Sequence, residues 1–116
     1  MINIYTLTEY YRGYDIVIKM LWSPGRSLVM PSRWFCGYVR IPENHKLYGM
    51  DYNDLEDILS VHGGVTFAGA LDGMDGFYVG FDCAHLGDTP DEQDEAYTLY
   101  ECKRLVDQLI EVDDAI

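Results

Sequence analysis

The stretch HGGVTFAGALDGMDGFYVGFDCAH, residues 62–85, decides the fold. It contains two runs rich in β-branched and aromatic residues, 65–68 and 77–81, and this composition is typical of β-strands. Residues 72–76 between them read DGMDG, a glycine-rich connector of the kind that closes a hairpin. We therefore expect the two runs to pair as antiparallel strands.

Both ends of this hairpin carry residues that can do chemistry. His62-Gly63-Gly64 directly precedes the first strand, and Asp82-Cys83-Ala84-His85 directly follows the second. In an antiparallel pair the start of one strand lies beside the end of the other, so the two segments should meet at one rim of the sheet. The candidate cluster at this rim comprises His62, Gly63, Gly64, Asp82, Cys83, His85 and Asp88.

Several roles are open to this cluster. Cys83 and His85 are two positions apart and project to one face of an extended chain, so with His62 they could ligate zinc, although the spacing matches no established zinc motif. Cys83 could instead be a nucleophile with a histidine as its base. The cluster could also recognise a ligand without chemistry. The interpretation that the sequence favours is structural: His and Asp side chains tie the loop ends together and cap a helix.

The remaining chain supplies more strands and a helix to cover them. Composition predicts strands over 2–11, 14–22 and 34–41, a turn at Ser23-Pro24-Gly25, and a short helix over 51–58 capped by Asp51 or Asn53. Thr89-Pro90-Asp91-Glu92 is a capping box followed by apolar residues at helical spacing, which predicts a helix from about Pro90 to Glu111. We expect one α+β domain, 1–116, with a mostly antiparallel sheet packed against one C-terminal α-helix.

Charge is distributed unevenly along the 116 residues. Residues 1–50 carry six Lys or Arg against three Asp or Glu (+3), whereas 51–116 carry two against seventeen (−15), which gives the total of −12. Such a negative surface repels nucleic acid and anionic membranes, and it could attract a basic protein surface. We expect an acidic partner surface made of Asp51, Asp54, Glu56, Asp57, Asp91, Glu92, Asp94 and Glu95.

The composition also disfavours several classes of protein. No apolar run approaches the roughly 20 residues that span a bilayer, and the N-terminus has no signal-peptide pattern, so we expect a cytoplasmic protein. Cys36, Cys83 and Cys102 are odd in number and form no C-x-x-C pair, which predicts reduced thiols. No cofactor is predicted, apart from the zinc considered for the rim.

Motifs over residues 33–110 occur together in a specific combination. They are Cys36-Gly37-Tyr38-Val39, the run from His62 to Phe67, the run from Gly80 to His85, and Tyr100, Glu101, Cys102, Leu105 and Leu109 near the C-terminus. This combination resembles a family of short, uncharacterised bacteriophage proteins, for which no activity is established. Small acidic phage proteins are similar in character to inhibitors of host defence, including anti-CRISPR proteins, some of which present carboxylates in place of phosphates.

The resemblance and the charge together lead to one functional expectation. It is a non-catalytic phage accessory protein in the host cytoplasm that inhibits an anti-phage defence complex by binding a basic protein surface. The alternative is a small-ligand or nucleotide-binding protein, or a zinc-dependent hydrolase, that uses His62, Cys83 and His85. A homo-oligomer, in which the +3 half of one copy meets the −15 half of another, is a further option.

Overall fold

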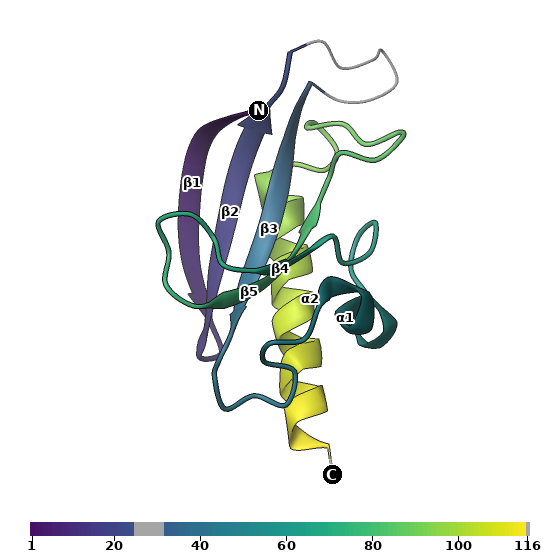
Figure 1. The fold of residues 1–116 in the computed structure, drawn as a ribbon. Helices are drawn as coiled ribbons and strands as arrows, with labels where there is room; N and C mark the ends of the chain where they lie inside the picture. The colour runs from purple at the N-terminus through teal and green to yellow at the C-terminus, as the bar shows by residue number, and fades with distance from the viewer. Residues whose placement is uncertain (25–31, 116) are drawn as a thin grey trace.

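The structure is a computed structural model that describes residues 1–24 and 32–115. Within these residues, one antiparallel sheet is accompanied by two helices, with α2 packed across one face of the sheet (Figure 1). The expected α+β fold with a C-terminal helix on an antiparallel sheet is confirmed. The elements are β1 (Ile2–Tyr11), β2 (Tyr14–Trp22), β3 (Arg33–Ile41), α1 (Tyr52–Ile58), β4 (Phe67–Gly69), β5 (Phe77–Asp82) and α2 (Glu95–Asp114).

The strand order is β1-β2-β3-β5-β4, and each neighbouring pair is antiparallel. A two-residue turn joins β1 to β2, in which Arg12 and Gly13 have φ values of 50° and 88°, the left-handed conformations of a type I′ hairpin. The expected antiparallel hairpin is present as β4 with β5, where Phe67 lies opposite Gly80, but its first strand covers residues 67–69 instead of 65–68. Gly25, the last residue of the expected turn after β2, lies outside the described residues.

The start of α2 differs from the sequence prediction. Thr89 does form a turn, because its Oγ1 accepts from the Glu92 N–H at 3.2 Å and its carbonyl accepts from the Gln93 N–H at 2.8 Å. Asp94 then takes an extended conformation (φ −85°, ψ −171°) and caps α2 by accepting from the Tyr97 N–H. The expected helix start at Pro90 with Thr89 as N-cap is therefore wrong, because a second capping residue interrupts the helix.

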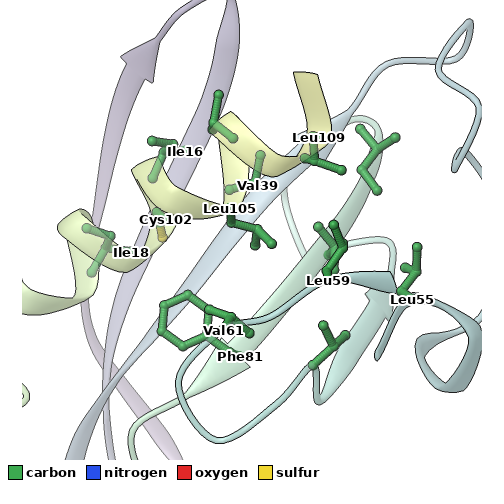
Figure 2. Close-up of a cluster of buried hydrophobic side chains, with 14 of the residues drawn as sticks. Ile16, Ile18, Val39, Leu55, Leu59, Val61, Phe81, Cys102, Leu105 and Leu109 are labelled. Carbon is green, nitrogen blue, oxygen red and sulfur yellow. The ribbon is translucent and has the colours of Figure 1, made fainter. Parts of the chain in front are cut away.

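The main core lies between α2 and the sheet. Figure 2 shows Cys102, Leu105 and Leu109 of α2 facing Ile16, Ile18, Val39 and Phe81 of the strands, and these side chains are buried. Burial of each large aliphatic or aromatic side chain stabilises the fold by about 1.5–3 kcal/mol. Gly37 permits the close approach of the helix, since a Cβ there would overlap Cys102 Sγ and the Phe81 ring. Leu55, Leu59 and Val61 extend this core under α1.

The opposite face of the sheet is covered differently. The connector between β4 and β5 crosses it (Figure 1), and Leu71 of that connector packs with Val17 and Tyr78. A separate small cluster, Leu21, Trp34, Cys36 and Ala84, lies on the same face. A search of the described chain found no helix with the length and apolar character that crossing a membrane requires.

Candidate functional site

The two segments that the sequence predicts to converge lie together at one rim of the sheet. The imidazole rings of His62 and His85 have centroids 6.0 Å apart. Hydrogen bonds of Thr66 explain the juxtaposition, because its N–H donates to Gly80 O at 3.0 Å and its hydroxyl donates to Asp82 Oδ2 at 3.1 Å. The hairpin therefore brings the residues before β4 beside those after β5. We call His62–Gly64, Asp82–His85 and Asp88 the rim cluster.

His62 is held on both sides of its ring. Its Nδ1 lies 2.7 Å from the Tyr97 hydroxyl and its Nε2 lies 2.9 Å from Asp88 Oδ2. A neutral imidazole protonated on Nε2 can donate to Asp88 and accept from Tyr97 at the same time. The backbone N–H of His62 also donates to Glu101 Oε1 at 2.9 Å. The bonds to Tyr97 and Glu101 hold His62 against the first turns of α2, and the bond to Asp88 holds it against the segment that precedes this helix.

Asp88 connects the two halves of the rim cluster. Its Oδ2 accepts from His62 Nε2 and also from the backbone N–H of His85, at 3.0 Å. The Asp88 side chain is only 9% exposed, so it has little water to replace a lost partner. Asp88 thus ties the 85–88 turn to His62.

Cys83 has a different environment from the two histidines. It is 1% exposed, belongs to the main core cluster, and its Sγ lies 3.8 Å from Thr98 Oγ1. Burial raises the pKa of the Cys83 thiol to about 12. A thiol that stays protonated at neutral pH is a weak nucleophile and a weak metal ligand. Across residues 1–24 and 32–115, no group of three or more His, Cys, Asp or Glu is placed to hold a metal ion.

His85 packs over the glycine turn. Its Nε2 is screened from solvent and lies 3.3 Å from Asp82 Oδ1, without the alignment of a hydrogen bond. A Cβ at Gly63 would overlap the His85 ring, and Gly63 also has a left-handed φ of 69°. Both the space and the backbone conformation therefore require glycine at this position.

Replacement of Gly63 by Ala should lower the free energy of unfolding by about 2–4 kcal/mol, because strain at positive φ adds to a clash with His85. Gly73 is the matched control, since its φ is 75° and no atom lies within 4 Å of where its Cβ would be. Gly73→Ala should cost only the backbone strain, about 1 kcal/mol. Urea unfolding of both variants measures the difference, and equal losses would show that the His85–Gly63 contact contributes nothing.

Two members of this network, Tyr97 and Glu101, were not predicted from the sequence. They are four residues apart on α2 and so share a face, which is the one signal that could have marked them. Glu101 is buried and is also bonded to Arg104 Nη1 at 2.8 Å. Burial, together with the nearby Glu101 carboxylate, raises the pKa of Tyr97, so its hydroxyl stays protonated as a donor for His62.

A hollow of about 450 Å³ lies beside the rim cluster, on the sheet face opposite α2. Leu21, Trp34 and Phe67 give it apolar and aromatic walls, while Asp82 and His85 contribute polar groups. Concave surfaces of this composition are the usual form of small-ligand sites. His62 and Cys83 do not line the hollow, so a ligand held there would contact a different part of the rim cluster from the one the sequence indicates.

All eight residues expected to form the acidic partner surface are solvent-exposed. Four belong to α1 or its N-cap, three lie on the segment that leads into α2, and Glu95 is the first residue of α2. Asp51 and Asp94 also serve as N-caps. Ion pairs in the part of the chain that the structure describes use other carboxylates, namely Asp15, Asp82, Asp88, Glu101 and Asp107.

Comparisons with known proteins do not assign this chain to a family. No protein-family model matches it, and no significant match was found among curated proteins or among solved structures.

Proposed function

We propose that this protein is a non-catalytic inhibitor that binds a basic surface of a partner complex through its acidic partner surface. The observation that carries the proposal is the set of eight exposed carboxylates, none of them in an ion pair with a cation of the described chain. In keeping with the resemblance to phage proteins, the proposed partner is a host defence complex of the kind that anti-CRISPR proteins inhibit, in the host cytoplasm.

Electrostatics supports a basic partner. Carboxylates that lack intramolecular cations repel one another, and a surface rich in Lys and Arg relieves this repulsion on binding. Complementary charge also accelerates encounter and selects against acidic competitors. A groove that holds nucleic acid is the most strongly basic surface a defence complex offers, since it must neutralise phosphates.

The rim cluster supports a binding role because it fixes the acidic segments in place. A Cβ at Gly64 would lie 2.7 Å from Glu56 Oε1, so α1 borders the glycine turn. His62 and Asp88 join that turn to the residues just before 91–95. The internal bonds of His62 and the buried thiol of Cys83 suit a brace between the two acidic segments better than a reactive centre.

Neutralising part of this surface should weaken inhibition. The variant carries Asp54→Asn, Asp57→Asn, Asp91→Asn and Glu92→Gln, which spare the capping residues Asp51 and Asp94. The matched control removes the same charge elsewhere, through Asp72→Asn, Asp75→Asn, Glu111→Gln and Asp114→Asn, all exposed positions. The assay is displacement of a labelled DNA duplex from RNA-guided DNA-binding complexes of host defence systems, followed by fluorescence anisotropy.

We expect the surface variant to need about 10- to 100-fold more protein for half-inhibition, and the control less than about 3-fold more. Inhibition by the wild-type protein should weaken as salt rises above physiological strength, because exposed charges are screened. Equal losses in the two variants would show that net charge, rather than this surface, matters. A wild-type protein that displaces DNA from none of the complexes would contradict the proposal.

A further inference from the structure

β1 is an edge strand that lacks the usual protection. It is ten residues long and ends the sheet, and no strand of the described residues pairs with its outer side. It contains no Pro and no Lys, and Glu9 is its one charged residue. Natural edge strands are commonly short, charged, interrupted by Pro or covered. The opposite edge strand, β4, has three residues and so meets that expectation.

The β1–β2 turn shows which backbone groups are free. In a hairpin closed by a two-residue turn, the residues that flank the turn form a hydrogen-bonded pair, here Tyr11 with Tyr14. Every second residue of β1 then bonds to β2, and the residues between them direct their N–H and C=O groups outward. The outward groups belong to Thr6, Thr8 and Tyr10. The register irregularity between Asn3 and Tyr5 disturbs only the start of the strand.

We propose that β1 pairs antiparallel with β1 of a second copy of this chain, so that the two sheets become one. Antiparallel pairing relates the copies by a two-fold axis near the middle of the strand, so the contact is self-complementary and closes as a dimer. Thr6 and Thr8 are exposed on the sheet face away from α2, where threonines paired across strands are favourable.

The charge distribution favours β1 over other surfaces for contact between copies. Two molecules of charge −12 repel each other. Residues 1–50, which include β1, carry a net charge of +3, however, and the acidic helix α1 lies away from the β1 edge of the sheet (Figure 1). The carboxylates of α2 that lie against β1 already have partners. Tyr5 donates to Glu95 Oε1 at 2.9 Å, and Arg12 donates to Asp107 Oδ1 at 2.8 Å. Pairing through β1 therefore leaves free the part of the acidic partner surface that α1 carries, whereas Glu95 of that surface lies beside β1.

The test is sedimentation equilibrium of the full chain at concentrations up to about 1 mM. At that concentration a dimer with a dissociation constant of about 1 mM or tighter is observable. The wild-type protein should be dimeric, and Thr8→Pro, which removes an outward N–H without breaking the β1–β2 ladder, should be monomeric. Thr8→Val is the control and should stay dimeric. Circular dichroism checks that each variant is folded. Because added salt screens the repulsion, it should strengthen the dimer, the opposite of its effect on the proposed partner binding.

Amide hydrogen exchange of the wild-type protein gives a readout that needs no variant. In the dimer the amides of Thr6, Thr8 and Tyr10 should be protected and should lose protection on dilution, while those of Leu7 and Glu9 stay protected throughout. A wild-type protein that is monomeric at every concentration overturns the proposal. A folded Thr8→Pro variant that remains dimeric also overturns it, because the contact would then lie elsewhere. Neither result bears on the inhibition assay.

Discussion

Native protein should be alkylated by iodoacetamide at pH 8 at least about a thousand-fold more slowly than the same protein in urea, because the reagent needs an accessible thiolate. Cys36, Cys83 and Cys102 are each at most 4% exposed. Burial raises the pKa of Cys36 to about 11 and that of Cys83 to about 12, and it raises the pKa of Cys102 as well. Mass spectrometry of quenched samples measures the modification of each cysteine.

The direction of these pKa shifts also predicts how the fold responds to alkali. Since each folded thiol has a pKa above its ordinary value of 9.0, the unfolded chain ionises first as pH rises. The thiols therefore stabilise the fold fully below pH 9, and this contribution is lost between pH 9 and about 11 to 12. Alkylation should accelerate in that window, when unfolding exposes the cysteines.

The alkylation experiment separates a core residue from a catalytic one. An activated nucleophile reacts at neutral pH in the folded state, and a buried one does not. Cys83→Ala identifies the signal of Cys83, and the urea sample shows that all three thiols can react. If Cys83 alone were modified rapidly in the native protein, it would be a reactive thiol at the rim, and the hydrolase alternative would replace the binding proposal.

The sequence was most informative where the deciding signal is local. Strands β1 and β2 have the predicted limits because a β-rich run is interrupted once, at Arg12-Gly13, by the two residues of the turn. The meeting of His62 with His85 also followed from a local signal, the glycine-rich connector between β4 and β5. Antiparallel pairing then leaves one arrangement for the segments that flank the strands.

The remaining features depend on contacts that are distant in sequence. Thr89 and Asp94 are both good N-caps, and the extended backbone at Asp94, rather than the capping box, sets where α2 begins. Cys83 continues the alternation of β5 and points into the main core, as Val79 and Phe81 do. Its thiol is buried there because α2, which is distant in sequence, packs over this face. The hydrogen bond from the His62 N–H to Glu101 could not be predicted, because the sequence does not show that α2 passes behind the Gly63-Gly64 turn.

Asp88→Ala should lower the free energy of unfolding by about 2–4 kcal/mol, because it leaves two donors of the rim cluster without an acceptor. These donors are His62 Nε2 and the backbone N–H of His85. Asp88→Asn keeps an acceptor oxygen and should lose about half as much. Asp72→Ala, at an exposed position, is the control and should change stability by less than about 0.5 kcal/mol.

Coupling to His62 shows whether the rim cluster acts as a brace. Once His62→Ala has removed the imidazole, Asp88→Ala should cost less, so the double variant should be about 1 kcal/mol more stable than the sum of the single losses. Urea unfolding of the wild type, the two single variants and the double variant gives the four free energies that this double-mutant cycle needs. If the rim cluster has only this structural role, each variant should lose inhibition only in proportion to the fraction of protein that is unfolded. If Asp88→Ala kept its stability but failed to displace DNA, Asp88 would instead belong to the surface that contacts the partner, and the acidic partner surface would extend across the rim.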